Sequence, residues 1–260
     1  MLITDYVEKN PKHIKELKND EVGFRYVHGV ANIIDSVGIK VFEKSLGDYP
    51  DITKKVYEGG FKIWECELDG VRFLLGYDKT REVVQGKRVL ELGCGSGLIG
   101  LACAVYGANS VAFQDYNKEV LVYHTASNIF LNKLDQNKGM GLSLIGGSWE
   151  DMLNKKQSFH VQLSDNKTST QSYDLIFGAD ILYEIENYTT LLNLFNNLLS
   201  DNGRVIIISK MYYYGNGGSL YEFQDYIEKD GRFVYNTLTV VNQSSSNKRE
   251  VFELTRKSGN

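Results

Sequence analysis

From Lys87 to the C-terminus, short apolar runs alternate with stretches in which apolar residues recur at helical spacing. This alternation is typical of α/β proteins, in which helices connect parallel strands. The expected strands are 88–92, 110–115, 141–146, 173–179 and 203–210, and the expected helices are 98–107, 117–132, 187–199 and 219–229. Two final apolar runs, 231–241 and 249–256, flank a short polar segment and should pair antiparallel. The pattern therefore predicts an α/β fold with a mostly parallel, seven-stranded sheet and an antiparallel terminal hairpin.

The N-terminal part of the chain and one internal segment do not follow this alternation. Residues 1–20 are polar with lysines at helical spacing, which predicts a loose or helical extension. Residues 24–46 carry scattered apolar positions that fit either a helix or strands. We therefore expect an N-terminal extension over 1–56 and a main domain over 57–260. The polar segment 154–172 is interpreted as a surface insertion without a core function.

Composition and charge narrow the class of protein. The 260 residues are 42% hydrophobic and include 17 tyrosines, which is ample for a core, and only two prolines argue against long linkers. A net charge of −4 does not favour direct nucleic-acid binding. No apolar run approaches the ~20 residues of a membrane span, and the N-terminus lacks the apolar core of a signal peptide. We expect a cytoplasmic monomer with no membrane contact, and passage into the nucleus is left open.

The three cysteines, Cys66, Cys94 and Cys103, form no C-x-x-C pair and no cluster with histidine. Zinc sites are built from such clusters, so we expect no metal site. A sparse, odd set of cysteines is typical of reduced thiols in an intracellular protein.

A glycine-rich loop follows the first expected strand, with Gly93, Gly95 and Gly97 directly before a helix. Glycines let the backbone turn sharply and let a ligand lie against it. A dinucleotide would fit, since Gly95, Gly97 and Gly100 spell G-x-G-x-x-G, but this motif is weak alone. Glu91 favours S-adenosylmethionine (SAM), because a carboxylate repels a pyrophosphate and attracts an ammonium group. A third interpretation is a turn that only packs a helix on a strand.

The next expected strand ends in Asp115, about 20 residues after the glycine loop. A carboxylate at this spacing meets the hydroxyl pair of a ribose. Both SAM and a dinucleotide carry a ribose there, so Asp115 predicts a nucleoside without choosing between them. Its alternative role, compatible with the first, is to cap the following helix.

Three separated motifs resemble one family. Residues 65–256 are similar to the Rossmann-like, seven-strand class I SAM methyltransferases. Within that class, Tyr57-Glu-Gly-Gly-Phe-Lys-Ile-Trp-Glu-Cys66 resembles a motif of the protein-histidine N-methyltransferases that modify a large-subunit ribosomal protein (L-three). Phe113-Gln-Asp-Tyr-Asn117 and Lys210-Met-Tyr-Tyr-Tyr-Gly215, followed by Gly217-Gly218, are similar to the same family.

This resemblance implies a SAM-dependent protein-histidine N-methyltransferase with a ribosomal protein as its substrate. Two alternatives stay open: a protein-lysine N-methyltransferase of the same branch, and a non-catalytic SAM-binding assembly factor. A histidine acceptor needs little help, because neutral imidazole, with a pKa near ~6.5, already has a free lone pair. A lysine acceptor, with a pKa near ~10.4, must first lose a proton, and no dedicated base for that step is evident.

The resemblance also implies which residues form the cofactor pocket. Trp64 would face the cationic sulfonium, and Ser148 with Trp149 would contact adenine. The structural alternatives are an ordinary core or hinge tryptophan for Trp64, and a capping box with Asp151 for Ser148. The implied cofactor-binding residues are Ile63, Trp64, Glu65, Cys66, Glu91, Gly93, Gly95, Gln114, Asp115, Tyr116, Ser148, Trp149 and Ala179.

The acceptor side of the site is implied by Asp180-Ile-Leu-Tyr183, which resembles the D-x-x-Y signature of protein lysine and histidine methyltransferases. These residues follow an expected strand at the edge where such folds place ligands. Asp180 is the candidate catalytic residue, which would hold the other ring N–H of the histidine acceptor. Tyr183, Tyr212 and Tyr213 are the candidate substrate-binding residues. The alternatives are a cap of the next helix for Asp180, and core or surface positions for Tyr212 and Tyr213.

Overall fold

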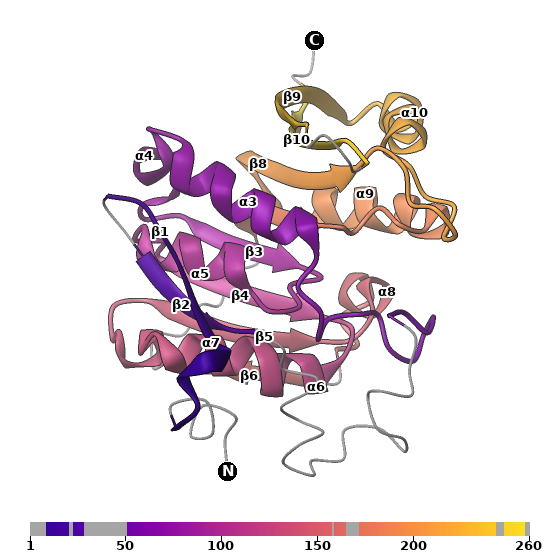
Figure 1. The fold of residues 1–260 in the computed structure, drawn as a ribbon. Helices are drawn as coiled ribbons and strands as arrows, with labels where there is room; N and C mark the ends of the chain where they lie inside the picture. Colours follow the sequence, from indigo (N-terminus) through magenta and orange to yellow (C-terminus); the bar gives the residue numbers. More distant parts are fainter. Residues whose placement is uncertain are drawn as a thin grey trace.

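The computed structural model describes residues 9–20, 23–28, 51–157, 159–164, 172–242 and 247–257. One large sheet passes through the centre of the molecule, and helices cover both of its faces (Figure 1). The strands of this sheet are β3 (Arg88–Leu92), β4 (Ser110–Asp115), β5 (Gly141–Gly146), β6 (Phe159–Gln162), β7 (Tyr173–Ala179), β8 (Leu199–Lys210), β9 (Phe233–Val241) and β10 (Arg249–Arg256). They lie in the order β6-β5-β4-β3-β7-β8-β10-β9.

Strands β3, β4, β5, β7 and β8 pair parallel with one another along the sheet, and β10 runs antiparallel to both β8 and β9. This arrangement confirms the expected α/β fold and its antiparallel terminal hairpin. The structure adds an eighth strand, because β6 pairs antiparallel with β5 at the edge of the sheet. The polar segment expected to be only a surface insertion therefore extends the sheet, although residues 158 and 165–171 of that segment lie outside the described residues.

The helices divide between the two faces of the sheet. One face carries α3 (Glu65–Gly76), α5 (Leu98–Val105) and α7 (Ala126–Leu131), and the other carries α8 (Trp149–Leu153), α9 (Tyr188–Leu198) and α10 (Leu220–Asp230). The remaining short elements are η1 (Pro11–His13), α4 (Thr80–Val84), α6 (Lys118–Val120), the π-helical η3 (Leu121–Thr125), η4 (Leu134–Gln136) and η5 (Ile185–Asn187). The expected helix 117–132 is thus present as α6, η3 and α7 in succession.

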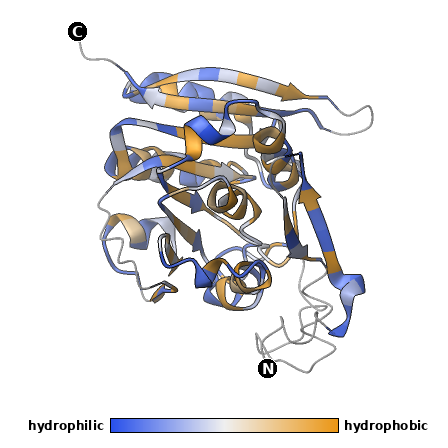
Figure 2. Cartoon of the chain, turned by 90° about the vertical axis from the view of Figure 1, so that its left-hand side faces the viewer, coloured by the Kyte–Doolittle hydropathy of each residue, from blue (hydrophilic) through white to orange (hydrophobic). Residues whose placement is uncertain are grey.

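The two hydrophobic cores explain why the chain forms these layers. The parallel strands are buried on both faces, as expected for a sheet sandwiched between helices, so they are apolar along most of their length. Helix α9 buries Leu191, Leu194 and Phe195 against one face while its other side stays polar. Figure 2 shows the hydrophobic positions of strands and helices gathered in the interior. Strand β8 starts earlier than the expected strand 203–210, since α9 ends at Leu198 and extended backbone follows directly from Leu199.

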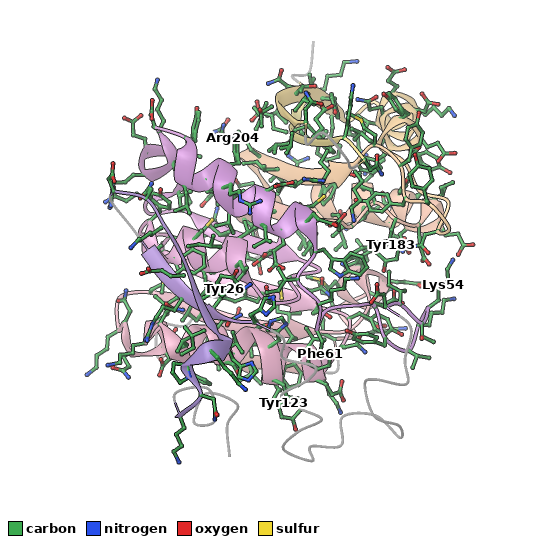
Figure 3. The ribbon with its side chains drawn as sticks, in the orientation of Figure 1. Tyr26, Lys54, Phe61, Tyr123, Tyr183 and Arg204 are labelled. Carbon is green, nitrogen blue, oxygen red and sulfur yellow. The ribbon has the colours of Figure 1, made fainter. Side chains whose placement is uncertain are left out.

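The N-terminal part of the described chain corrects one expectation. Residues Ile14–Lys18 form β1, which pairs antiparallel with β2 (Gly23–Val27), so these residues are neither loose nor helical. Residues 1–8 of the expected extension lie outside the described ranges. Phe24 and Tyr26 of β2 are buried in the core beside α5. Figure 3 shows Tyr26 on the face of the sheet that carries α3, α5 and α7. The side chain of Asn128 on α7 accepts a hydrogen bond of 2.8 Å from the backbone N–H of Val27. The rest of the expectation for 24–46 falls on residues outside the described ranges from residue 29 onward, and the domain boundary at 56 stays a prediction.

The strand order determines where a ligand can bind. The carboxyl ends of β3, β4 and β7 are neighbours in the middle of the sheet, and each is followed by a loop rather than by more sheet. Open α/β sheets bind their ligands at this edge. No helix in the described ranges combines the length and apolar character needed to cross a bilayer.

Candidate cofactor and acceptor site

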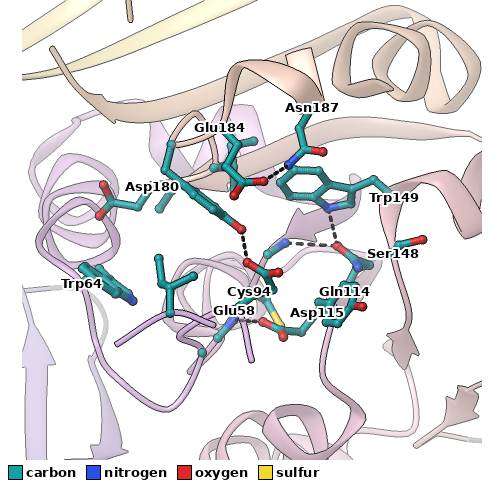
Figure 4. A pocket seen from close by; sticks show the side chains of 18 of the residues that line it. Glu58, Trp64, Cys94, Gln114, Asp115, Ser148, Trp149, Asp180, Glu184 and Asn187 are labelled. Atoms are coloured by element: carbon teal, nitrogen blue, oxygen red, sulfur yellow. Dashed lines mark hydrogen bonds between the residues drawn. The ribbon is translucent and has the colours of Figure 1, made fainter. Parts of the chain in front are cut away.

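A cavity of about 350 Å³ opens at the carboxyl ends of β3, β4 and β7. Figure 4 shows that Trp149 and Gln114 lie at one end of it, and that Asp180 and Trp64 lie at the other. We call these two ends the nucleoside end and the acceptor end. Thirteen of the residues expected from the sequence line this cavity, namely Trp64, Glu91, Gly93, Gly95, Gln114, Asp115, Tyr116, Ser148, Trp149, Ala179, Asp180, Tyr183 and Tyr213.

The glycine loop after β3 forms the floor of the cavity. Gly93, Gly95 and Gly97 all have positive φ angles, between 51° and 77°, a backbone conformation that strongly favours glycine. A Cβ atom on Gly95 would also come within 3.3 Å of the carbonyl oxygen of Gly60, which belongs to the motif at 57–66. The loop therefore needs glycine both for its turn and for its close approach to that motif.

Asp115, at the end of β4, is buried beside this loop. Its Oδ2 accepts a hydrogen bond of 2.9 Å from Gly95 N–H, and its Oδ1 accepts one of 3.0 Å from Asn117 N–H. The N-cap residue of the next helix is Asn117. Asp115 therefore does not have its alternative role, which was to cap that helix. Burial raises the pKa of Asp115 to about 6. The ribose contact stays a prediction that this position permits.

Two further buried carboxyl groups, Glu67 and Glu91, lie beneath the same loop. Glu67 Oε1 accepts hydrogen bonds from Ser96 Oγ and, over 3.1 Å, from Leu98 N–H, while Glu91 Oε2 accepts one of 2.8 Å from Gly100 N–H. Burial raises the pKa of Glu67 to about 7 and that of Glu91 well above its usual value. None of the sequence motifs assigned a role to Glu67. The signal that could have indicated it is a charged residue on the side of α3 that faces the core.

The charges of Glu67, Glu91 and Asp115 bear on whether this cavity fits SAM. None of the three forms an ion pair with a lysine or arginine in the part of the chain that the structure describes. Buried carboxylates without a counter-charge are costly unless they are protonated or meet a cation. A ligand with an ammonium and a sulfonium group supplies that positive charge, whereas a pyrophosphate would add repulsion. The residues present therefore fit SAM better than a dinucleotide.

Gln114 organises the nucleoside end. Its side-chain oxygen accepts hydrogen bonds from Gly93 N–H at 3.2 Å and from Trp149 Nε1–H at 2.9 Å, and its nitrogen donates to Gly147 O at 2.8 Å. The Trp149 indole is thereby fixed as a wall of the cavity, a position suited to stacking on an aromatic base. Ser148 caps α8 in a full capping box with Asp151, which confirms the structural alternative for Ser148, although Ser148 also lines the cavity.

Asp180 directly follows β7 and adopts a left-handed backbone, with φ of 54°. Its Oδ2 accepts a hydrogen bond of 3.2 Å from Cys66 N–H, so Asp180 caps the first turn of α3. Its alternative role required it to cap the helix that follows β7, which differs from this arrangement. Its Oδ1 is buried, accepts no hydrogen bond from any described residue, and faces the Lys210 ammonium at 3.5 Å. One carboxylate oxygen is thus fixed by the backbone of α3, and the other is paired with Lys210 at the acceptor end.

Lys210, the last residue of β8, is the second residue that the sequence did not assign. Its ammonium lies 2.9 Å from Glu65 Oε2 and sits over the ring of Trp64, 5.1 Å from the centroid. The Trp64 ring, expected to face a sulfonium, also has the ammonium of Lys62 at 4.4 Å. Lys210 belongs to one of the motifs that resemble the methyltransferase family, and this position is the signal that could have indicated its role.

The candidate tyrosines separate into three environments. Tyr183 lines the cavity and donates a hydrogen bond of 2.7 Å to Glu58 Oε2, which joins the loop after β7 to the motif at 57–66. Burial raises the pKa of Tyr183. Tyr213 is buried at the acceptor end, where its hydroxyl lies 3.1 Å from Ser209 Oγ. Tyr212 lies outside the cavity and is 48% exposed.

Four of the expected site residues do not line the cavity. Ile63 packs against the core, Cys66 is buried in α3, and Tyr212 is on the surface beside Tyr214 and Tyr221. The side chain of Glu65 is 62% exposed and reaches the site only through Lys210. Their direct contact with a cofactor or substrate stays a prediction that this placement does not support.

The cysteines behave as buried thiols. Cys66, Cys94 and Cys103 are free, and burial raises the pKa of each thiol well above its usual value. Among the described residues, no group of three or more histidine, cysteine, aspartate or glutamate side chains is placed to hold a metal ion.

A family model described as "Lysine methyltransferase" matches residues 51–218. Among curated proteins, the chain is 37% identical to "Histidine protein methyltransferase 1 homolog" of Dictyostelium discoideum over 84% of this chain and 64% of that protein. It is 34% identical to the protein of the same name from Mus musculus, over 85% of this chain and 63% of that protein. The chain thus spans slightly less than two thirds of the length of these curated relatives.

A solved structure shares the fold. The "magnesium protoporphyrin IX methyltransferase (ChlM)" of Synechocystis PCC 6803, determined with bound S-adenosylhomocysteine (SAH), matches with a TM-score of 0.53 at 13% identity. The match covers 88% of this chain and 98% of that chain. It confirms the class I methyltransferase architecture and carries no further information about substrate.

Proposed function

The chain belongs to the methyltransferase family described as "Lysine methyltransferase", and on that premise we propose that it is a SAM-dependent protein-histidine N-methyltransferase. Its similarity to histidine protein methyltransferase 1 homologues over most of its length supports a histidine acceptor. The resemblance of residues 57–66, 113–117 and 210–218 to the same family adds to that support.

The nucleoside end would hold SAM. Asp115 would accept hydrogen bonds from the ribose hydroxyls, Trp149 would wall the adenine, and the glycine loop would lie under the methionine end. Burial raises the pKa values of Glu67 and Glu91 beneath the loop, and the ammonium and sulfonium groups of a bound SAM would favour their ionised forms. Bound SAM supplies an electrophilic methyl group, which becomes bonded to the acceptor nitrogen as its bond to sulfur breaks.

The observation that carries the proposal is Oδ1 of Asp180, which faces the Lys210 ammonium at 3.5 Å. It is a buried carboxylate oxygen, it accepts no hydrogen bond from the described residues, and its residue lines the cavity. An imidazole with one N–H pointed at this oxygen presents the lone pair of its other nitrogen to the methyl group. Asp180 therefore fixes the tautomer and orientation of the acceptor, and after transfer it or water takes the proton from the N–H.

The substrate that we propose is a protein of the large ribosomal subunit, acted on in the cytoplasm or during passage through the nucleus. The resemblance of the motif at 57–66 supports this choice, and the net charge of −4 is compatible with a basic protein partner. We expect the chain to act as a monomer without direct nucleic-acid binding.

A lysine acceptor is the second candidate, because the matching family model bears that description. A lysine side chain would have to enter this end as an ammonium beside the ammonium of Lys210, and the two like charges repel. The geometry therefore favours the acceptor that is already neutral.

The test is an incubation of the purified chain with methyl-labelled SAM and unmethylated large-subunit ribosomal proteins, followed by amino-acid analysis of the labelled product. Label in methylhistidine is the expected result. Label in methyllysine would move the chain to the second candidate. No label, with SAM binding measured by calorimetry, would favour a SAM-binding assembly factor instead.

A further inference from the structure

The acceptor end carries a fixed positive charge that the proposed reaction has not yet used. Lys210 Nζ is placed between Glu65 Oε2 at 2.9 Å and Asp180 Oδ1 at 3.5 Å, and its side chain is only 17% exposed. The rings of Trp64 and Tyr213 lie 5.1 Å and 5.8 Å from the same nitrogen. Two carboxylates and two aromatic rings thus hold one ammonium group at the wall of the cavity.

The surroundings keep Lys210 charged. Burial alone would lower its pKa, but Asp180 and Glu65 outweigh that effect, so the pKa is raised overall. The other titratable groups that face it are the thiol of Cys66 on α3 and the hydroxyl of Tyr213 after β8, and both have raised pKa values and stay neutral. Arg249 on β10 is nearby but forms its own buried ion pair with Asp69.

We propose that Lys210 is a specificity-determining residue. Its ammonium balances the charge of Asp180, so that the acceptor imidazole binds in its neutral form. Acceptors that carry a positive charge are rejected. This inference deepens the proposed function and rests on it. Without a neighbouring cation, a buried carboxylate would favour the protonated imidazolium, which has no lone pair to accept a methyl group. With Lys210 in place, Asp180 can accept a hydrogen bond from a neutral ring without drawing in a second proton.

The same charge acts against a lysine acceptor and against the product. An incoming lysine ammonium that pairs with Asp180 would lie beside the ammonium of Lys210. Like charges at such distances repel strongly in a buried site. The methylated ring carries a positive charge until its N–H proton leaves to Asp180 or water. Lys210 disfavours that cation, which favours proton loss and release of the neutral product.

The test compares the pH dependence of kcat, at saturating protein substrate, for the wild type, Lys210→Met and Lys210→Arg, with large-subunit ribosomal protein as the probe and methylhistidine formation as the readout. In the wild type, kcat should rise with pH as the bound imidazole becomes neutral, because kcat reports the pKa values of the enzyme–substrate complex. In Lys210→Met the uncompensated Asp180 stabilises the imidazolium, so this rise should move to higher pH by about one unit or more. Lys210→Arg retains the charge and should keep the rise near its wild-type pH.

A purely structural role would lower activity at every pH without moving the profile. A Lys210→Met profile that rises at the wild-type pH, or a Lys210→Arg profile shifted as far as that of Lys210→Met, would overturn the inference. Since Lys210→Met leaves Asp180 and Glu65 without their cation, its fold is checked by circular dichroism, and Lys210→Gln provides a polar variant that must show the same shift. Wild-type enzyme that makes no methylhistidine would refute the proposed function itself, which distinguishes the two failures.

Discussion

The two ends of the cavity are built in different ways. At the nucleoside end, Asp115 binds Gly95 and Gln114 binds Trp149, which are 20 and 35 residues apart along the chain. At the acceptor end, Asp180 binds Cys66 and Tyr183 binds Glu58, which are 114 and 125 residues apart. The nucleoside end is thus assembled by adjacent strand–loop units, whereas the acceptor end forms only when the motif at 57–66 meets the loop after β7. A local cofactor site can be shared by many enzymes, while the long-range acceptor end is where this chain can differ from them.

The largest expected effect separates the two ends through Asp180→Asn. Asparagine tolerates the left-handed backbone at this position and can still accept the hydrogen bond from Cys66 N–H. It removes the charge that takes the imidazole proton, so turnover should fall roughly 100-fold or more while the SAM dissociation constant changes little. Labelled methyl transfer measures the first quantity and calorimetry the second. Asp201→Asn, at an exposed position on β8, is the control, and turnover in Asp180→Asn equal to that of this control would refute the role of Asp180.

Asp115→Ala should affect the opposite end. It removes the carboxylate that binds Gly95 N–H and that we expect to bind the ribose hydroxyls, so SAM should bind about 10- to 100-fold more weakly. Calorimetric titration with SAM gives this ratio. Asp115→Asn keeps one acceptor oxygen and should lose less affinity than the alanine variant. If the alanine variant binds SAM with the wild-type affinity, the ribose assignment is wrong.

Glu67→Gln should change how stability depends on pH. Because burial raises the pKa of Glu67 from 4.5 to about 7, the folded chain holds a proton between these values that the unfolded chain releases. This proton stabilises the fold at low pH, and the stabilisation is lost as pH rises to 7. Glutamine keeps an acceptor for Leu98 N–H without the charge, so its free energy of unfolding relative to the wild type should improve between pH 5 and pH 8, by on the order of 3 kcal/mol.

Urea unfolding of both proteins without SAM, at pH 5 and at pH 8, measures that difference. Only the change of the difference with pH bears on Glu67, because the other buried carboxyl groups are common to both proteins. An equal offset at the two pH values would show that Glu67 does not titrate in this range.

Trp149→Phe should have the smallest effect. It removes the Nε1–H donor to Gln114 but keeps an aromatic wall, so SAM should bind only about 2- to 10-fold more weakly. Trp149→Ala, which removes the wall as well, should weaken binding further. Equal affinities for the two variants would show that the ring does not contact the adenine.

How well the sequence predicted these regions follows the same division. The strand ends, the glycine loop, Asp115 and the terminal hairpin could be predicted, because apolar runs, glycines and strand-end acids carry their signal within a few residues. The edge strand β6 was missed, since its mostly exposed residues carry no burial pattern. Strand β1 was missed because lysines at positions 12, 15 and 18 imitate helical spacing, whereas β2 falls almost wholly in the range 24–46 for which strands were left open.

At the site, the sequence led to Asp180 but not to its partners. The capping of α3 by Asp180, the burial of Glu67 and the placement of Lys210 all depend on contacts between distant segments, which no local pattern records. For the same reason Ile63, Glu65 and Cys66 were grouped with Trp64, although none of the three lines the cavity.

The most direct test of the proposed site is a crystal structure of the chain with bound SAH. We predict that the ribose hydroxyls lie within hydrogen-bonding distance of Asp115, that the adenine lies against Trp149, and that the sulfur points toward Asp180 and Lys210. A ligand whose sulfur points away from Asp180, or whose ribose lies away from Asp115, would contradict the division of the cavity into a nucleoside end and an acceptor end.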